Sequence, residues 1–374
     1  MQDREENNAI RALSTPDNCV DFSSNDYLGF AKNETIYANT FQLSLKKDIS
    51  QNGATGSRLL SGNYPLYNEI EEHLAQFHKC ESALIFNSGY DANIGIFSAV
   101  PQRNDVVFYD EYIHASIRDG IKLGNAKSYK FKHNDFGDLK TRCQAEQTKS
   151  NKDTEIYIVT ESVFSMDGDS PNLKEFAKFC SMEGFHLIVD EAHALGVFGK
   201  KGEGLVHKLG IEKQLFARIV TFGKALGCHG AAILGDKELK SYLVNFARSF
   251  VYTTGLPPHS VATTMSAYDY LSTNADNEEI QKLTDNIKYF NSKIETLKLN
   301  PFFIKSHSAI HSCLISGNDK VKLVSEKLID KGFNVKAILS PTVPEGEERL
   351  RFCLHSYNTK EEIGLVLQLL KSYL

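Results

Sequence analysis

The chain has 374 residues, of which 41% are hydrophobic and 24% charged, the proportions of an ordinary globular protein. Its formal net charge of −5 excludes a bulk attraction to nucleic acid or to anionic membranes, and no apolar run approaches the roughly 20 residues that span a bilayer. The start of the chain is polar and the seven cysteines form no Cys-x-x-Cys pair. We therefore expect a cytoplasmic protein with reduced thiols, without a signal peptide and without a metal site.

Residues 1–31 are predicted to form an N-terminal arm. A short strand pattern, Val20-Asp21-Phe22, runs there into polar residues around Asn25. An asparagine in such a turn commonly satisfies local backbone groups, and this interpretation of Asn25 stays open.

Residues 32–275 are predicted to form a large α/β domain, because short apolar runs alternate there with segments of helical length. The strand-like runs are 83–86, 105–109, 156–160, 186–190, 218–222 and 231–234. Continuous apolar strands separated by helices indicate a mostly parallel sheet that is covered on both faces. Ligand sites in such sheets lie at the carboxyl ends of the strands, which points to residues 87–90, Glu161, Asp190 and Lys224.

Residues 276–374 are predicted to form a smaller α+β domain. Apolar residues from Ile280 to Leu297 step by three and four, which is typical of a long amphipathic helix. Residues 310–315 have the pattern of a strand, and Thr359 with Glu362 forms a capping box that opens a final helix.

Lys224 follows Gly223 between two strand-like runs. For an arbitrary lysine, the alternative interpretation is an ordinary turn residue. A lysine at the end of a buried strand can instead be desolvated, so that its amine becomes nucleophilic enough to hold a carbonyl compound as a Schiff base. The obvious compound is pyridoxal phosphate (PLP), which also needs an acidic partner for its ring nitrogen and a phosphate site.

Asp190 ends the apolar run 186–190 and is a candidate for that acidic partner. A carboxylate at this position would keep the ring nitrogen protonated, and His193 would then hydrogen-bond the ring oxygen. The alternatives are a structural acid that binds backbone amides and a histidine satisfied in a turn.

The segment Ser88-Gly89-Tyr90 follows a buried strand and opens a helix. Free amides at a helix N-terminus bind phosphate, and Gly89 lets the backbone come close, although strand-to-helix turns use glycine anyway. His114 is unremarkable alone, but its imidazole can stack on a flat cofactor.

Four motifs, in this order, resemble those of the α-oxoamine synthases, which are PLP enzymes. They are Gly56-Ser-Arg-Leu-Leu-Ser-Gly62, Phe164-Ser-Met-Asp-Gly-Asp169, Asp190-Glu-Ala-His193 and Thr221-Phe-Gly-Lys224. The resemblance runs from about Asp21 to the C-terminus. It implies the aspartate-aminotransferase-like PLP-dependent transferase fold (fold type I), with a mostly parallel seven-stranded sheet in the large domain.

The resemblance also implies roles for individual residues. Lys224 would bind PLP and then act as the base, Asp190 and His193 would bind the ring nitrogen and ring oxygen, and His114 would stack on the ring. The expected cofactor site comprises Ser88, Gly89, Tyr90, His114, Glu161, Ser165, Asp190, His193, Thr221, Lys224 and Thr254.

Thr254 matches a residue that reaches the phosphate from the neighbouring subunit, which implies a homodimer with shared active sites. Its alternative role is to cap the helix after Pro257 and Pro258. Asn25 and Arg351 match positions that hold the amino-acid carboxylate, and Thr342 one near the substrate. Either of Arg349 and Arg351 could instead be a charge at the rim of the site.

The implied reaction is the decarboxylative condensation of an amino acid with an acyl thioester. The wording of the motifs favours L-alanine and pimeloyl-CoA or pimeloyl-acyl-carrier protein, giving 8-amino-7-oxononanoate, CO2 and the free thiol in biotin biosynthesis. One alternative is another α-oxoamine synthase, such as a glycine C-acetyltransferase or a serine palmitoyltransferase. Another is a non-catalytic subunit with a PLP-enzyme fold.

Overall fold

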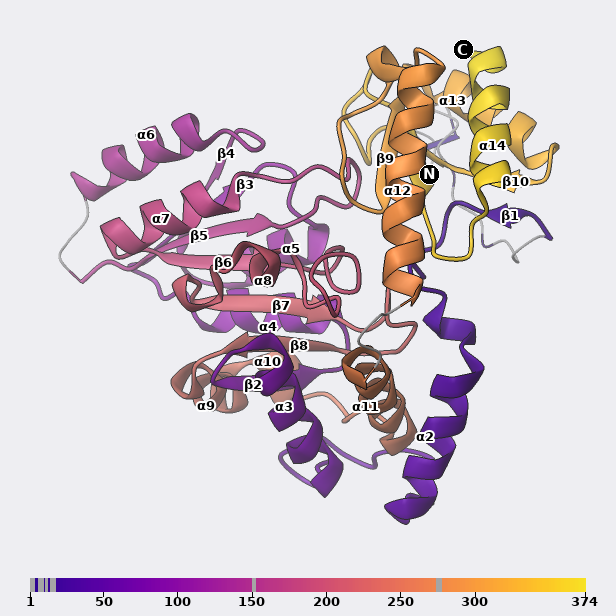
Figure 1. The fold of residues 1–374 in the computed structure, drawn as a ribbon. Helices are drawn as coiled ribbons and strands as arrows, with labels where there is room; N and C mark the ends of the chain where they lie inside the picture. The colour runs from indigo at the N-terminus through magenta and orange to yellow at the C-terminus, as the bar shows by residue number, and fades with distance from the viewer. Residues whose placement is uncertain (1–3, 6–9, 11–12, 14–17, 150–152, 274–277) are drawn as a thin grey trace. The chain divides into compact units, whose positions relative to one another are not determined.

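The structure is a computed structural model that describes residues 4–5, 10, 13, 18–149, 153–273 and 278–374 (Figure 1). The chain forms two compact units. The larger unit contains residues 30–164 and 170–277, and the smaller unit contains residues 1–29, 165–169 and 278–374. Within the described residues, no helix is both long and apolar enough to cross a membrane.

The larger unit is built on a seven-stranded sheet with the order β2-β8-β7-β6-β5-β3-β4. Strands β3 to β7 are parallel, whereas β8 is antiparallel to both of its neighbours, so that β2 runs parallel to β7. The strands are β2 (Ser82–Phe86), β3 (Val106–Asp110), β4 (Lys127–Phe131), β5 (Ile156–Glu161), β6 (His186–Asp190), β7 (Ala217–Thr221) and β8 (Ala231–Gly235).

Helices follow most of these strands. They are α2 (Glu34–Lys46), α3 (Pro65–His78), α4 (Gly89–Ala99), α5 (Ala115–Leu123), α6 (Phe136–Gln147), α7 (Leu173–Glu183), α8 (Leu205–Leu209), α9 (Lys237–Phe246), α10 (Arg248–Val251) and α11 (Pro258–Thr273). Short 3₁₀ turns form at Phe30–Lys32 (η1) and Glu212–Gln214 (η2).

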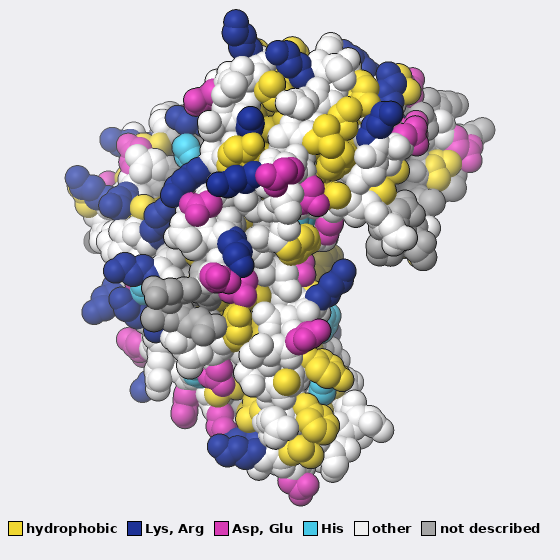
Figure 2. Space-filling view, turned by 45° about the vertical axis from the view of Figure 1, so that its right-hand side comes forward, with side chains coloured by type: hydrophobic (Ala, Val, Ile, Leu, Met, Phe, Trp, Pro, Cys, Tyr) yellow, Lys and Arg dark blue, Asp and Glu magenta, His cyan; other side chains and the backbone are white. Residues whose placement is uncertain are grey.

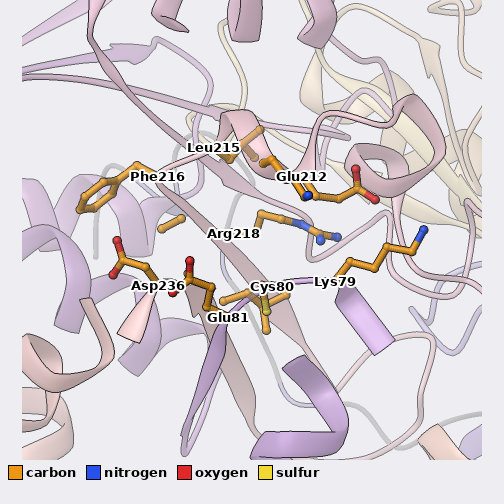
Figure 3. Close-up of a pocket in the computed structure, with 12 residues that line it drawn as sticks. Lys79, Cys80, Glu81, Glu212, Leu215, Phe216, Arg218 and Asp236 are labelled. Carbon is orange, nitrogen blue, oxygen red and sulfur yellow. The ribbon is translucent and has the colours of Figure 1, made fainter. Parts of the chain in front are cut away.

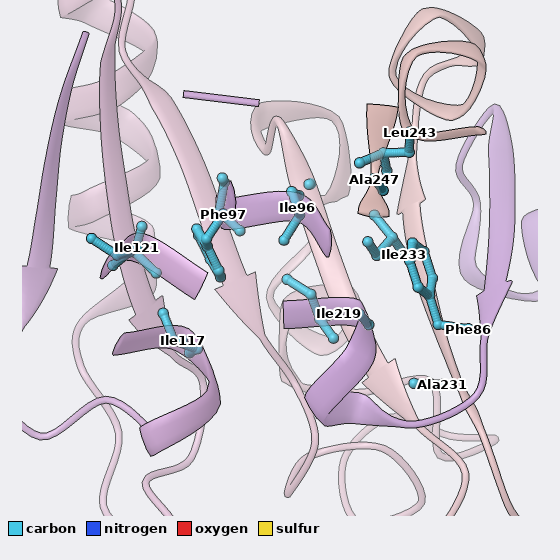
Figure 4. Packing of buried hydrophobic residues seen from close by; sticks show 14 of the residues in the cluster. Phe86, Ile96, Phe97, Ile117, Ile121, Ile219, Ala231, Ile233, Leu243 and Ala247 are labelled. Atoms are coloured by element: carbon cyan, nitrogen blue, oxygen red, sulfur yellow. The ribbon is translucent and has the colours of Figure 1, made fainter. Parts of the chain in front are cut away.

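Two hydrophobic cores lie on opposite faces of this sheet, because successive strand residues point to opposite sides. Val107 packs with residues of α4, α5 and α9, whereas its neighbours Val106 and Phe108 pack with residues of α6 and α7. Figure 4 shows the first core, where Ile219 and Ile233 from the strands meet Ile96 of α4. Burial on both faces explains why the strands are continuous apolar runs.

The smaller unit contains two small sheets and three helices among the described residues. The antiparallel sheet has the order β11-β12-β9, and β1 pairs with β10 in parallel. The strands are β1 (Val20–Asp21), β9 (Ile310–Leu314), β10 (Phe333–Asn334), β11 (Lys336–Ile338) and β12 (Arg349–Cys353). The three α-helices are α12 (Glu278–Thr296), α13 (Asn318–Ile329) and α14 (Lys360–Tyr373), and a short 3₁₀ turn, η3, forms at Asn300–Phe302.

The predicted fold class is confirmed: the larger unit has a mostly parallel seven-stranded sheet with helices on both faces. The six predicted strands are present, as are the long helix after residue 278 and the capping box of α14. The division into 1–31, 32–275 and 276–374 stays a prediction. Most of residues 1–17 and all of residues 274–277 at its second boundary lie outside the described residues.

The segment Ser165–Asp169 belongs to the smaller unit although the chain on both sides of it belongs to the larger one. The hydroxyls of Ser306 and Ser308 donate to the carbonyl of Gly168, at 2.8 and 2.9 Å. Gly168 has φ of +75°, and a Cβ there would overlap the carbonyl of Ile310. Only glycine therefore fits this close approach.

Candidate active site

The strand-end residues singled out from the sequence gather at one edge of the larger unit's sheet. Since β2, β5, β6 and β7 are parallel, their carboxyl ends share that edge. Ser88 follows β2, Glu161 and Asp190 end β5 and β6, and Lys224 follows β7. His114 follows β3, the strand next to β5, at the same edge.

Lys224 is partly buried, and its Nζ lies 2.7 Å from Nε2 of His193. The amide of Gly227 donates to the Lys224 carbonyl at 2.8 Å, which closes a tight turn after β7. Gly227 has φ of +60°, and a Cβ there would overlap the backbone of Ala31. This turn therefore places Lys224 against His193. The interpretation of Lys224 as an ordinary solvated turn residue does not fit this contact.

Asp190 is buried, and both of its carboxylate oxygens accept hydrogen bonds. The amide of Ala192 donates to Oδ1 and Nδ2 of Asn93 donates to Oδ2, each at 2.9 Å. These two donors hold the carboxylate in one orientation. Asp190 also binds a backbone amide, as the structural alternative expects, so the contact alone does not separate the two interpretations.

Glu161 lies beside Asp190 in the register of β5 and β6, and it is also buried. Burial, and then the charge of Asp190, raise the pKa of Glu161 to about 8. Its Oε1 accepts a hydrogen bond from the amide of His114 at 2.6 Å. The Glu161 carboxyl is therefore mostly protonated at neutral pH.

Replacing Glu161 by Gln should change how stability depends on pH in the cofactor-free protein. Between the ordinary pKa of 4.5 and about 8, the unfolded chain has lost the Glu161 proton that the folded chain keeps. The contribution of Glu161 to the free energy of unfolding therefore falls as the pH rises from 4.5 to about 8. The urea midpoint of Glu161→Gln should exceed that of wild type by a margin that grows from about pH 5 to about pH 8. Glu72→Gln, at an exposed position of α3, is the control; a constant margin would contradict the protonated state of Glu161.

The N-terminus of α4 lies beside Thr221 of β7. Ser88 is its N-cap, and its Oγ accepts from the amide of Asp91 at 3.0 Å. A Cβ on Gly89 would lie 3.5 Å from Oγ1 of Thr221. The helix amides at Gly89 and Tyr90, which the Ser88 side chain does not cap, therefore offer donors for an anion. The nearby Thr221 hydroxyl donates to the carbonyl of Gly230 at 3.3 Å and would have to turn to join them. The Tyr90 ring is exposed, and its hydroxyl donates to Asp119 at 2.8 Å.

His114 is the N-cap of α5, and its Nδ1 accepts from the amide of Ser116 at 3.2 Å. Burial, and then the positive charge of Lys224, lower the pKa of His114. The imidazole is therefore neutral at physiological pH.

An ion pair that sequence reasoning missed supports the segment 190–193. Glu191 is fully buried and accepts from Nε of Arg218 at 2.9 Å, while its other oxygen accepts from the amide of Val206 at 2.9 Å. An arginine at the start of an apolar strand could have signalled a buried acid, because buried charges need partners.

The predicted carboxylate-binding residues Asn25 and Arg351 contact one another in the smaller unit. Oδ1 of Asn25 accepts from a terminal nitrogen of Arg351 at 3.0 Å and from the hydroxyl of Tyr27 at 3.1 Å. Nε of Arg351 donates to the carbonyl of Ser165 at 2.6 Å. The Asn25 side chain thus binds other side chains rather than local backbone groups.

The alternative that Arg349 or Arg351 is a rim charge is wrong, because both are buried. Arg349 forms an ion pair with buried Asp167, which anchors the segment 165–169 to β12. Thr342 is exposed in the loop between β11 and β12, and its amide donates to the carbonyl of Leu339 at 2.8 Å.

Thr254 is exposed in the loop between α10 and α11. Its carbonyl accepts from Nδ2 of Asn87 at 2.6 Å, and its side chain makes no hydrogen bond to the described part of the chain. Helix α11 begins only at Pro258. Thr254 therefore does not cap this helix in the structure.

A cavity of about 590 Å³ lies at the opposite edge of the sheet from Lys224 (Figure 3). Ala217 and Arg218 at the start of β7 line it, together with Gly235 at the end of β8 and with Lys79 and Glu81 before β2. It is therefore distinct from the strand-end site.

The chemistry of the strand-end residues fits PLP. They provide an amine, a carboxylate held by two donors, a neutral imidazole, and a helix N-terminus beside a hydroxyl. These are the groups that PLP requires of a protein. Fold and site together define a PLP-dependent enzyme of fold type I.

Comparisons with known proteins agree with this class. Residues 17–369 match the family model described as "Aminotransferase class I and II". The 8-amino-7-oxononanoate synthase of Emericella nidulans is 38% identical, with 100% of this chain and 94% of that protein covered. The chain therefore belongs to the 8-amino-7-oxononanoate synthase family within the class I and II aminotransferases.

Solved structures show the same relationship. A crystal structure of 8-amino-7-oxononanoate synthase from Francisella tularensis has a TM-score of 0.77 at 30% identity, with 95% of this chain and 97% of that one covered. Serine palmitoyltransferase from S. paucimobilis, solved with a bound adduct of PLP and myriocin, has a TM-score of 0.86 at 28% identity, with 94% and 86% covered.

Proposed function

We propose that the protein condenses L-alanine with pimeloyl-CoA or pimeloyl-acyl-carrier protein, giving 8-amino-7-oxononanoate, CO2 and the free thiol in biotin biosynthesis. The observation that carries the proposal is the pair of Lys224 Nζ and His193 Nε2, 2.7 Å apart at the same sheet edge as Asp190, in a chain 38% identical to a synthase of that name.

Bound PLP supplies an electron sink that stabilises negative charge at the α-carbon of the amino acid. Lys224 holds the cofactor through Nζ and later takes the α-proton on the same atom. For that second role Nζ must be neutral, and the contact with His193 Nε2 gives its proton a place to go. The α-carbon then displaces the thiol from the acyl thioester, and the carboxylate of the condensed product is lost as CO2. The same amine finally returns the proton to the α-carbon.

Asp190 binds the protonated ring nitrogen in this proposal, and the donors at its two oxygens hold its carboxylate in one orientation. His193 binds the ring oxygen and His114 lies on the ring face. The amides at Gly89 and Tyr90 bind the phosphate together with Thr221, because a helix N-terminus and a hydroxyl both donate to anions. Ser88, Glu161 and Ser165 complete the proposed cofactor site.

Asn25 and Arg351 bind the carboxylate of L-alanine. Tyr27 and Arg351 donate to Oδ1 of Asn25 and so fix the orientation of its amide group. The amide nitrogen is then the atom of this side chain that would donate to the substrate carboxylate. The fork of Arg351 matches a carboxylate, and the Ser165 carbonyl fixes its orientation at Nε. Thr342 lies near the acyl substrate in this proposal.

We infer that the active unit is a homodimer in which Thr254 reaches the partner's phosphate site. The exposed hydroxyl of Thr254 and the 73% exposed ring of Tyr252 support this. Helix α2 packs on α11 with one side and exposes Tyr37, Phe41 and Leu45 on the other. Figure 2 shows hydrophobic side chains gathered toward the lower end of that view, on the part of the chain that Figure 1 draws as α2. A second copy of the chain would cover this stripe.

We also propose that the protein acts in the cytoplasm. All seven cysteines are free, and Cys143, Cys180, Cys313 and Cys353 are buried. Unpaired thiols are typical of a reducing compartment.

Substrate assays test the proposed reaction. Purified protein with PLP is offered L-alanine, glycine or L-serine, each with acetyl-, pimeloyl- or palmitoyl-CoA, and release of the free thiol is measured. We expect the highest kcat/KM for L-alanine with pimeloyl-CoA. A preference for glycine with acetyl-CoA would overturn the assignment.

The second candidate is a serine palmitoyltransferase, favoured by the TM-score of 0.86 to such an enzyme. That structure is 28% identical to the chain, against 38% for the Emericella synthase. Preference for L-serine with palmitoyl-CoA in the same assays would establish this candidate instead.

A further inference from the structure

A buried chain of hydrogen bonds joins Asp190 to His114 through Asn93 and Ser116, neither of which is among the predicted site residues. Asn93 of α4 and Ser116 of α5 are 2% and 1% exposed. Nδ2 of Asn93 donates to Asp190 Oδ2 at 2.9 Å and to Ser116 Oγ at 3.0 Å. Oγ of Ser116 lies 2.8 Å from Nδ1 of His114. The four side chains thus form one continuous path between the sheet edge and α5.

The direction of the first two bonds follows from the chemistry of the Asn93 amide. Its nitrogen has two hydrogens, and both are used. Its Oδ1 is buried and has no hydrogen-bond partner in the described residues. Turning the amide over would place this oxygen against the Asp190 carboxylate, so that two acceptors would meet. The amide therefore keeps the orientation in which Nδ2 donates to Asp190, although this orientation leaves Oδ1 without a hydrogen bond in the described residues.

The direction of the last bond follows from the cap of α5. The backbone amide of Ser116 donates to Nδ1 of His114, and an amide can only donate. Nδ1 is therefore unprotonated, and the single N–H of the neutral imidazole is on Nε2. Because Nδ1 carries no hydrogen, the 2.8 Å contact between Nδ1 and Ser116 Oγ uses the hydrogen of the serine hydroxyl. Protonating Nδ1 would break the bonds from both Ser116 donors.

The surroundings of His114 favour the same neutral state. Lys224 and Asp190 face it from the strand ends, and Arg118 and Asp119 from its own helix. Glu161 binds its backbone amide. Burial and the charge of Lys224 hold the pKa of His114 below its ordinary value.

We propose that Asn93 and Ser116 are positioning residues: together they hold the Asp190 carboxylate and fix His114 as the neutral Nε2–H tautomer. His114 then presents its Nε2–H as a hydrogen-bond donor toward the substrate. The role in catalysis rests on the proposed function, whereas the tautomer is a property of the protein itself.

The tautomer is tested by NMR of the PLP-bound protein labelled with ¹⁵N at histidine, with the His114 signals assigned by their loss in His114→Gln. We expect His114 to show Nδ1 as the unprotonated nitrogen at pH 7. Ser116→Ala keeps the backbone amide but loses the hydroxyl, so the Nδ1 signal should shift because one of its two hydrogen bonds is gone, and Ser116→Thr, which keeps the hydroxyl, should restore it. Finding the Nδ1–H tautomer in wild type would overturn the proposal.

The link to Asp190 is tested by Asn93→Leu, which keeps the volume but removes the donor. We expect kcat to fall by about 10- to 100-fold with a smaller change in the KM for L-alanine, and the visible absorbance of bound PLP to shift. Ser98→Ala is the matched control on α4, since its hydroxyl binds only the Ile94 carbonyl. An unchanged spectrum and rate in a folded Asn93→Leu protein would refute the positioning role. Absence of any activity in wild type would instead refute the proposed function and leave the tautomer result standing.

Discussion

Lys224→Ala should abolish the visible absorbance of lysine-bound PLP and reduce turnover by at least about 10³-fold. In the proposed mechanism the same amine holds the cofactor and takes the proton, and general base catalysis alone contributes about 10²–10⁴-fold. The fold should persist, since Lys224 is only partly buried and follows rather than forms β7. The measurements are an absorbance spectrum with PLP and the release of thiol from pimeloyl-CoA in the presence of L-alanine.

Lys200→Ala is the control, because Lys200 is an exposed lysine of the same unit. It should keep both the absorbance and the rate, and the melting temperatures of both variants should match that of wild type. Activity of Lys224→Ala within a hundredfold of wild type would contradict its assigned role. If the wild-type protein itself gave no visible absorbance with PLP, the non-catalytic alternative would be favoured.

The sheet of the larger unit could be predicted because most of its strands are buried on both faces and are therefore continuous apolar runs. β4 was missed for the same physical reason. It is an edge strand paired only with β3, and Lys127, Ser128, Tyr129 and Lys130 are exposed, so its residues lack that pattern. Edge strands in solvent are often polar, and their sequences then resemble loops.

The strand-end residues of the candidate site could be predicted from one rule about parallel sheets. The residues that support them could not, because their positions depend on contacts between distant segments. Asn93 reaches Asp190 over 97 positions and Ser116 over 23 positions of sequence. A buried asparagine on an apolar helix gives no sign of which partner it will meet.

The packing of Ser165–Asp169 with the smaller unit was equally hidden. Its carbonyls are bound by Ser306, Ser308 and Ser312, and Asp167 pairs with Arg349. None of these partners lies within 130 positions of the segment, and small hydroxyl residues are common everywhere on protein surfaces. The sequence motif Phe164 to Asp169 marked the segment as important without indicating what it contacts.

The cross-subunit role of Thr254 predicts that two inactive proteins become active when mixed. In Thr254→Val the phosphate site loses a hydroxyl from the partner, so PLP retention and activity should fall. If each site combines Lys224 of one chain with Thr254 of the other, as proposed, one site of a hybrid with Lys224→Ala carries both lesions and the other carries neither. Random exchange makes about half of the dimers hybrid and leaves half of their sites intact, so activity should approach about one quarter of wild type.

The mixing experiment needs proof that the subunits have exchanged, which two different affinity tags on the variants provide through co-purification. The control is Thr273→Val, at an exposed threonine at the end of α11 whose hydroxyl, among the described residues, binds the carbonyl of Asp269. Thr273→Val should retain activity alone. After mixing with Lys224→Ala, the activity should be no higher than the amount of Thr273→Val protein in the mixture accounts for. The side chain of Thr254 has no hydrogen bond within the described part of its own chain. Thr254→Val alone should therefore bind PLP more weakly than wild type, but its melting temperature without PLP should not change. Exchanged hybrids without a gain in activity would place Thr254 in its own subunit's site or outside the site.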